Sequence, residues 1–220
     1  MVALDCKMKW FLFIMACWIN AAVYGQAGVR PDEAIVRLKE GNKRFVTGKS
    51  TKPRQDFSRI TEVANSQYPF ATIVGCSDSR VPAEIIFDQG LGDLFIVRTA
   101  GQVSTYASWG SIEFAEEILG TKLIVVMGHT KCGAVTAAVN VPDVPGHIVT
   151  LINAIKPAVE RARKKEPPVL VDAAIRENVL MQVEQLKSLE PVLAKRVREG
   201  SVTIIGALYN LNTGEVEFLD

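Results

Sequence analysis

Short apolar runs alternate with longer amphipathic segments along this chain, and that alternation limits the possible folds more than any other feature. The runs are apolar at nearly every position, as is typical of strands buried on both faces. They cover residues 70–74, 94–97, 123–127 and 202–208. Helical periodicity marks residues 104–119, 131–139, 148–163, 172–189 and 191–198. Strands that alternate with helices predict an α/β fold, in which a mostly parallel sheet is flanked by helices.

The two ends of this pattern add one strand and one helix. Residues 202–209 and 216–219 are joined by the turn-rich segment 210–214, which favours a hairpin. We therefore expect four parallel strands plus an antiparallel edge strand. Residues 30–46 begin near a proline and carry apolar residues at helical spacing, so they predict an N-terminal helical arm. Such an arm often packs on a partner subunit.

Residues 1–27 differ from the rest of the chain and predict a secretory signal peptide. Lysines precede an apolar run over residues 10–19, and Gly25 and Ala27 are suitable cleavage positions. The run is shorter than the ~20 residues of a membrane-spanning helix. We therefore expect an exported protein, either periplasmic or secreted. The weaker alternatives are a lipid anchor at Cys17, an uncleaved anchor and no export.

The remaining residues, 28–220, suffice for one domain with a full hydrophobic core, and we expect a single domain there. The net charge of +1 offers no broad basic surface, so we expect no nucleic-acid partner. Of the 4 cysteines, only Cys76 and Cys132 lie outside the predicted signal. In an exported protein an isolated pair of cysteines favours a disulfide.

Polar motifs follow two of the predicted strands. CSDSR, residues 76–80, follows the first strand, and GHTKCG, residues 128–133, follows the third. Open parallel sheets bind ligands in the crevice beyond the carboxyl ends of their strands, so both motifs are expected to face one crevice. His129 and Cys132 are three residues apart at the predicted start of a helix, where their side chains can point to one side.

The donor set of Cys76, His129 and Cys132 suits zinc, because two thiolates and one imidazole are common zinc ligands. Three protein ligands leave the fourth tetrahedral position open, as in catalytic zinc sites. A disulfide explains neither His129 nor the charged residues Asp78 and Arg80, so we prefer one zinc ion per subunit. If the metal were lost in an oxidising compartment, the two thiols would be near disulfide distance.

Asp78 and Arg80 have two functional interpretations beside an open zinc site. Held by a bidentate pair with Arg80, Asp78 can accept a hydrogen bond from zinc-bound water and orient that water. Alternatively, Asp78 takes the fourth position on zinc and closes the site. A purely structural salt bridge is the third interpretation.

The paired motifs Cys-x-Asp-x-Arg and His-x-x-Cys, on successive parallel strands, resemble the β-class carbonic anhydrases over essentially the whole mature chain. The resemblance implies a zinc lyase that reversibly hydrates carbon dioxide to bicarbonate and a proton, with zinc-bound hydroxide attacking CO₂. It implies that Cys76, His129 and Cys132 bind zinc and that Asp78 and Arg80 orient the water. It also implies a homodimer or a dimer of dimers.

The resemblance further assigns substrate contacts to Gln67, Phe95, Phe114 and Gly133. Gln67 stands where the family often has a glutamine that hydrogen-bonds substrate, and the two phenylalanines match an apolar wall that a neighbouring subunit provides. Phe114 replaces the tyrosine of plant-type members, and ordinary core packing is the alternative for both rings. Ile73 occupies the position of a tryptophan in members that bicarbonate inhibits, which favours the open, water-ligated site.

Two other functions are compatible with the same residues. A related zinc hydrolase of carbon disulfide or carbonyl sulfide on this scaffold would carry similar residues at the zinc and differ in access to the site. A non-catalytic zinc- or bicarbonate-binding protein belongs to a different class, and the intact Asp78–Arg80 pair disfavours it. Measuring CO₂ hydration by the purified protein separates the main interpretation from both.

Overall fold

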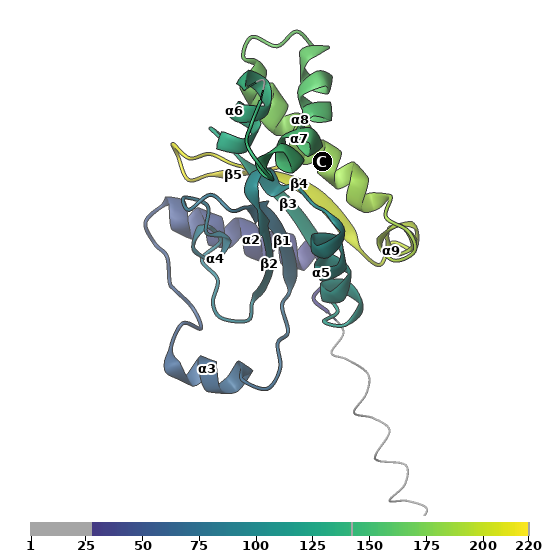
Figure 1. The fold of residues 1–220 in the computed structure, drawn as a ribbon. Helices are drawn as coiled ribbons and strands as arrows, with labels where there is room; N and C mark the ends of the chain where they lie inside the picture. Colours follow the sequence, from purple (N-terminus) through teal and green to yellow (C-terminus); the bar gives the residue numbers. More distant parts are fainter. Residues whose placement is uncertain (1–27, 142, 220) are drawn as a thin grey trace, which may run out of the picture.

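The computed structural model describes residues 28–141 and 143–219, which are organised around one five-stranded sheet (Figure 1). The strands are β1 (Ala71–Cys76), β2 (Leu94–Thr99), β3 (Leu123–His129), β4 (Thr203–Tyr209) and β5 (Val216–Leu219). Their order in the sheet is β2-β1-β3-β4-β5. The first four strands pair in parallel and β5 pairs antiparallel with β4. The predicted α/β fold with an antiparallel edge strand is confirmed.

The register brings the carboxyl ends of β1 and β3 together. β1 lies between β2 and β3, with Cys76 opposite Thr99 and Gly75 opposite Met127. Every residue of β1 and β3 is buried, as expected for inner strands of a parallel sheet. The two strands that carry the polar motifs are therefore direct neighbours.

Helices cover both faces of this sheet (Figure 1). They are α2 (Pro31–Val46), α3 (Phe57–Val63), α4 (Ala83–Ile86), α5 (Tyr106–Glu117), α6 (Gly133–Asn140), α7 (Ile148–Arg163), α8 (Leu170–Lys187) and α9 (Leu193–Arg198). Residues of α2 and α4 share one hydrophobic cluster with the sheet, and residues of α5, α8 and α9 share another. A third cluster joins α6, α7 and α8 around the two cysteines.

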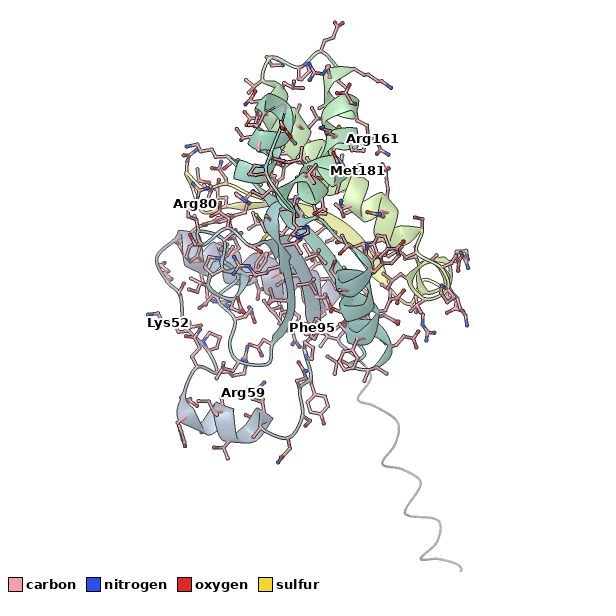
Figure 2. The ribbon with its side chains drawn as sticks, in the orientation of Figure 1. Lys52, Arg59, Arg80, Phe95, Arg161 and Met181 are labelled. Carbon is pink, nitrogen blue, oxygen red and sulfur yellow. The ribbon has the colours of Figure 1, made fainter. Side chains whose placement is uncertain are left out.

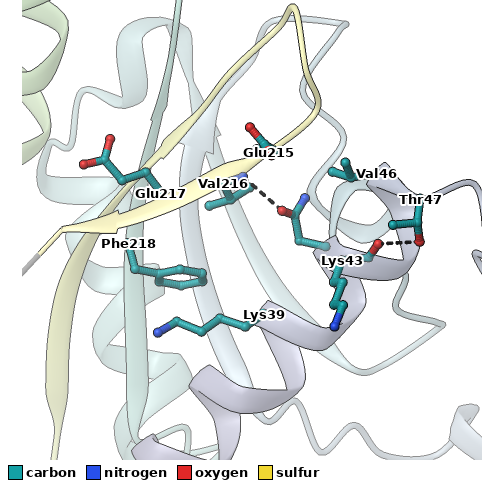
Figure 3. Close-up of a pocket in the computed structure, with 9 residues that line it drawn as sticks. Lys39, Lys43, Val46, Thr47, Glu215, Val216, Glu217 and Phe218 are labelled. Atoms are coloured by element: carbon teal, nitrogen blue, oxygen red, sulfur yellow. Dashed lines mark hydrogen bonds between the residues drawn. The ribbon is translucent and has the colours of Figure 1, made fainter.

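The N-terminal helix α2 packs on the sheet of its own chain. Ala34 and Leu38 are fully buried in the cluster on that face. The Asn42 side chain donates to the carbonyl oxygen of Gly214 at 2.9 Å. It also accepts from the backbone N–H of Val216 at 2.9 Å, which is the dashed line at Val216 in Figure 3. The sheet of the same chain therefore covers the apolar face of this arm. Packing of the arm on a partner subunit stays a prediction.

A surface groove of about 590 Å³ runs between α2 and β5 (Figure 3). Lys39 and Lys43 line one side, and Glu215 and Glu217 line the other. The groove lies at the edge of the sheet formed by β5, whereas the two cysteines and His129 lie on β1, β3 and the start of α6. It is therefore separate from the polar motifs.

Three helices begin later than the sequence predicted, and one of them is α9, which begins at Leu193 instead of 191. α6 begins at Gly133 instead of 131, because Lys131 adopts the left-handed region with φ 57°. α5 begins at Tyr106 instead of 104, after Thr105 forms a capping box with Ser108. Sequence periodicity missed α3 and the 3-10 turn η1 (Ala100–Gln102), because short helices show too few repeats for the pattern.

Within residues 28–141 and 143–219, no helix has both the length and the apolar character needed to cross a membrane. The predicted signal peptide and the alternative lipid site at Cys17 fall in residues 1–27, which lie outside the described residues.

Candidate metal centre

Potential ligand atoms of Cys76, His129 and Cys132 converge at the carboxyl edge of the sheet. The three atoms lie within 4.8 Å of one another, and all three residues are buried. Cys76 is the last residue of β1 and His129 is the last residue of β3, so strand pairing places them near each other. Both cysteines are free thiols. The predicted cluster is confirmed, and the two cysteines do not form a disulfide in this structure.

The imidazole of His129 is oriented to bind a metal. Its Nδ1 lies 3.0 Å from the carbonyl oxygen of Thr130, which makes Nδ1 the protonated nitrogen in a neutral ring. Its Nε2 is buried and has no hydrogen-bond partner among the described residues. A buried acceptor without a partner is costly, and a cation at Nε2 would remove that cost. The donor set and this unpartnered nitrogen together fit zinc.

A turn, not a helix, brings His129 and Cys132 together. His129 still belongs to β3, Lys131 has a left-handed backbone with φ 57°, and Cys132 is the N-cap of α6. The prediction that both residues lie at the start of a helix is therefore wrong. The strand continues through His129 because its backbone pairs with Tyr209 of β4.

Hydrogen bonds to sulfur make the two thiols unequal. The contact with the Cys132 side chain lowers the pKa of Cys76 to about 4, and the same contact raises the pKa of Cys132. The pair therefore shares one proton when no metal is present. The backbone N–H groups of Ala134 and Val135, at the start of α6, favour a thiolate at Cys132. A cation in place of the shared proton would stabilise both thiolates.

Asp78 and Arg80 form the expected bidentate pair. Arg80 Nε donates to Asp78 Oδ1 at 2.9 Å, and Nη2 donates to Oδ2 at 2.7 Å. The hydrogen bond from the guanidinium of Arg80 holds the pKa of Asp78 well below its usual range. Asp78 Oδ2 lies 3.8 Å from Nε2 of His129. An ionised carboxylate therefore faces the cluster of potential ligands.

Arg98 of β2 also supports this motif, and the sequence analysis missed it. Its Nε donates to the carbonyl oxygen of Cys76 at 2.9 Å, and its Nη2 donates to that of Asp78 at 2.7 Å. Arg98 pairs with Gly75 in the sheet, so its side chain reaches the segment that follows β1. A signal was present, because a charged residue interrupts the otherwise apolar run of β2.

The two phenylalanines assigned to the apolar wall lie at the opposite end of the sheet. Phe95 pairs with Thr72, four residues before Cys76, which corresponds to about 13 Å along a strand. Phe114 of α5 is 46% exposed, and its ring centroid lies 6.5 Å from that of Phe95. Figure 2 shows Phe95 and Arg80 toward opposite ends of the sheet. Within one chain, these rings do not reach the metal centre.

Gln67 and Gly133 also differ in position. Gln67 is exposed in the segment that leads into β1, at the end of the strand far from Cys76. Gly133 is exposed and directly follows Cys132 as the first residue of α6. One chain therefore places only Gly133 of the four assigned substrate contacts next to the potential ligands.

Comparison with known proteins agrees with this geometry. The profile of a family described as carbonic anhydrase matches residues 71–216, a range that includes the cluster and the Asp78–Arg80 pair. The solved β-carbonic anhydrase from Coccomyxa, in complex with acetazolamide, superposes with a TM-score of 0.67 at 27% identity, over 82% of this chain and 83% of that one. The chain belongs to the β-class carbonic anhydrase family.

Two curated carbonic anhydrases extend the similarity over most of the chain. Carbonic anhydrase 2 of Mycobacterium tuberculosis is 42% identical over 194 residues, which cover 86% of this chain and 93% of the relative. A carbonic anhydrase of Mycolicibacterium smegmatis is 41% identical over 191 residues, which cover 85% and 92%. The resemblance inferred from the two motifs is confirmed.

Proposed function

We propose that this chain is a zinc enzyme that interconverts carbon dioxide and bicarbonate. The observation that carries the proposal is the buried Cys76, His129 and Cys132 cluster with an ionised carboxylate facing it. Membership of the β-class carbonic anhydrases supports the same reaction. Bound zinc supplies a Lewis acid that makes water nucleophilic near neutral pH.

Side chains of this chain would bind the metal and orient the water. The sulfur atoms of Cys76 and Cys132 and Nε2 of His129 would hold the metal. Asp78 would accept a hydrogen bond from the water and orient the water toward CO₂. Arg80 keeps that carboxylate ionised and fixes its orientation through two parallel hydrogen bonds.

The arrangement of Asp78 favours the site in which this residue is not a zinc ligand. Both carboxylate oxygens accept from the guanidinium of Arg80, and Oδ1 also accepts from the Arg80 backbone N–H at 2.9 Å. Binding of Asp78 to zinc would require at least some of these bonds to break. X-ray absorption at pH 8 is expected to show two sulfur ligands, one imidazole and one oxygen from water. A carboxylate oxygen in the place of water would contradict the open site.

We infer that the enzyme is a homodimer or a dimer of dimers. Phe95 and Phe114 lie too far from the metal ligands of their own chain to form an apolar wall for CO₂. A neighbouring copy that brings these rings and Gln67 to the metal centre would complete the site. The incomplete set of substrate contacts in one chain supports this assembly.

Stopped-flow CO₂ hydration by the zinc-loaded protein at pH 8 to 9 tests the proposed reaction. We expect activity in the unmodified protein and a loss of roughly 10²–10⁴-fold in Asp78→Ala, with zinc content retained. Asp32→Ala is the matched control, because Asp32 is an exposed aspartate that pairs with Arg30 at 3.3 Å. No hydration by zinc-loaded protein would contradict the proposal. Turnover of carbon disulfide or carbonyl sulfide instead would identify the related hydrolase.

We also propose that the enzyme is exported, on the basis of the signal-like composition of residues 1–27. Expression with the native N-terminus, followed by N-terminal sequencing of the mature protein, tests this proposal. A new N-terminus at 26 or 28 in a periplasmic or extracellular fraction is expected. An intact N-terminus in the cytoplasm would contradict export, and a lipid on Cys17 would identify the anchored alternative.

A further inference from the structure

A backbone N–H group points at one of the proposed zinc thiolates. Gly101 N donates to Cys76 Sγ at 3.2 Å from the turn η1. Gly101 and Gln102 have left-handed backbones, with φ 68° and φ 46°. This conformation is unfavourable for a residue with a side chain and persists only where the surrounding structure enforces it. Something in the fold therefore has to hold this turn in place.

Asn178 of α8 is the residue that holds it. Its side chain is fully buried, and Nδ2 donates to the carbonyl oxygen of Gly101 at 2.9 Å. Asn178 therefore holds Gly101, the residue whose N–H donates to the sulfur, through the carbonyl group of Gly101. The separation of 77 residues between Gly101 and Asn178 makes this a contact of tertiary structure.

Close packing of α8 brings Asn178 to the turn. Val179, the next residue, lies over two glycines of neighbouring strands. A Cβ on Gly128 of β3 would lie 2.5 Å from Val179 Cγ2, and a Cβ on Gly206 of β4 would lie 2.9 Å from Val179 Cγ1. Real Cβ atoms do not approach this closely, so any side chain at these positions would push α8 away. The absence of side chains at Gly128 and Gly206 therefore lets α8 pack close enough to the strands for Asn178 to reach Gly101.

We propose that Asn178 is a positioning residue for the zinc site and that it acts through Gly101 on the Cys76 thiolate. The proposal rests on the proposed function, because it requires Cys76 to bind a metal. An N–H donor withdraws charge from a thiolate. Two thiolates would otherwise neutralise Zn²⁺, so this hydrogen bond preserves Lewis acidity at the metal. Partners of metal ligands commonly change metal affinity by roughly 10–100-fold when they are removed.

Two variants remove the donor in different ways. Asn178→Leu keeps a similar volume without a donor, and Asn178→Ala avoids any clash from the new side chain. Gln182→Met is the matched control. Gln182 is also buried on α8, one turn later, and its side chain accepts from the backbone N–H of Ser104 at 3.2 Å. It therefore holds the segment after the same turn, and among the described residues it forms no hydrogen bond with Gly101.

The experiment measures metal binding and the electronic state of sulfur in the full chain. Zinc affinity is measured by competition with a chromophoric chelator, and Co²⁺ replaces zinc for absorption spectroscopy. Both Asn178 variants are expected to bind zinc roughly 10–100-fold more weakly. Their thiolate-to-cobalt charge-transfer band is expected at longer wavelength, because a sulfur without its N–H donor is more electron-rich. Gln182→Met is expected to keep the wild-type affinity and band position.

The outcomes separate this inference from the proposed function. If the unmodified chain binds no zinc, or shows no thiolate-to-cobalt band, the proposed metal site itself fails. If it binds zinc and hydrates CO₂ while both Asn178 variants keep its affinity and band, only the role of Asn178 fails. Equal changes of zinc affinity and band position in Gln182→Met would also overturn the role of Asn178, since the effect would then be general to α8. Loss of folding in both Asn178 variants but not in the control would make Asn178 a stability residue and overturn it as well.

Discussion

At the scale of a single residue, Asp88 shows how one buried carboxylate can join three segments. Its side chain is 1% exposed and accepts from Arg44 Nε of α2 at 2.6 Å. It also accepts from the backbone N–H groups of Thr51 and Lys52 at 3.0 and 2.9 Å. Burial alone would raise the pKa of Asp88, but the bonds from Arg44 and the two N–H groups outweigh burial and lower the pKa to about 2.

Asp88→Asn is expected to reduce the free energy of unfolding at pH 7 by about 2–4 kcal/mol, because it removes the charge that Arg44 pairs with. The pKa of Asp88 is lower in the folded state than in the unfolded state. The extra free energy of unfolding of the wild type over Asp88→Asn is therefore fully present above the unfolded pKa of ~3.9. The advantage is lost as pH falls through about 2. Urea unfolding of both proteins across this range checks the prediction. Asp32→Asn, at an exposed pair, is the control, and a difference that does not narrow in acid would contradict the assignment.

At the scale of elements, α5 and α9 meet through a crowded charge cluster. Arg196 Nε lies 3.3 Å from Glu116 Oε1, and Arg196 Nη2 lies 2.9 Å from Glu117 Oε1. The Glu116 side chain is only 9% exposed. Its burial, reinforced by the neighbouring charge of Glu117, raises the pKa of Glu116 to about 7. The junction therefore includes a carboxyl group that resists ionisation.

Glu116→Gln is expected to stabilise the protein by about 1–3 kcal/mol at pH 8 and to have little effect near pH 4. The folded pKa of this acid is raised, so the wild type loses stability as pH rises from the unfolded value of 4.5 through about 7. Glutamine removes that loss. Chemical denaturation at the two pH values measures the difference, with the exposed Glu40→Gln as control. An equal effect at both pH values would show that ionisation of Glu116 is not the cause.

The contact between α8 and the sheet gives a second prediction at this scale. Gly128→Ala places a Cβ 2.5 Å from Val179 Cγ2. Overpacking of this kind costs about 1–3 kcal/mol, so we expect a lower melting temperature. Gly75→Ala on β1 is the matched control, because no described atom lies within 4 Å of its added Cβ. Equal melting temperatures for the two variants would mean that α8 moves away from the sheet with no loss of stability.

At the scale of the whole molecule, large apolar side chains are exposed on α3 and α5. No residue of α3 is buried, and Phe57 at its start is 81% exposed. Tyr106 of α5 is 87% exposed, and Ile118 directly after α5 is 67% exposed. Large exposed apolar side chains on these two helices favour an interaction surface. They are consistent with the second subunit that the proposed active site needs.

Phe57→Glu is expected to shift the protein toward monomer, because a charge at a subunit interface would be desolvated. Zinc content is expected to stay constant while CO₂ hydration falls, since Phe95 and Phe114 of a second copy are then missing. Light scattering after size-exclusion chromatography, zinc analysis and stopped-flow assays measure the three quantities. Val169→Glu, at another exposed apolar position, is the control. A fully active monomer would contradict the shared active site.

Local patterns were sufficient to predict the strands, the long helices and the potential metal ligands. The apolar runs identified the four parallel strands, because burial on both faces of a parallel sheet leaves a continuous signal in a few residues. The two motifs identified Cys76, His129 and Cys132, because donor chemistry belongs to the residue type. The turn at Lys131 was not predicted, since a left-handed backbone at a lysine has no pattern in the neighbouring residues.

The sequence by itself determined the strands, the long helices and the side chains that can hold zinc. Only the tertiary structure decided that β1 and β3 are neighbours, that α2 packs on its own sheet and that Phe95 lies far from the metal centre. It also decided that Asn178 reaches Gly101. The reason is that periodicity and residue chemistry act over a few neighbouring residues. These contacts, by contrast, join segments far apart in the chain, and the packing of whole elements selects them.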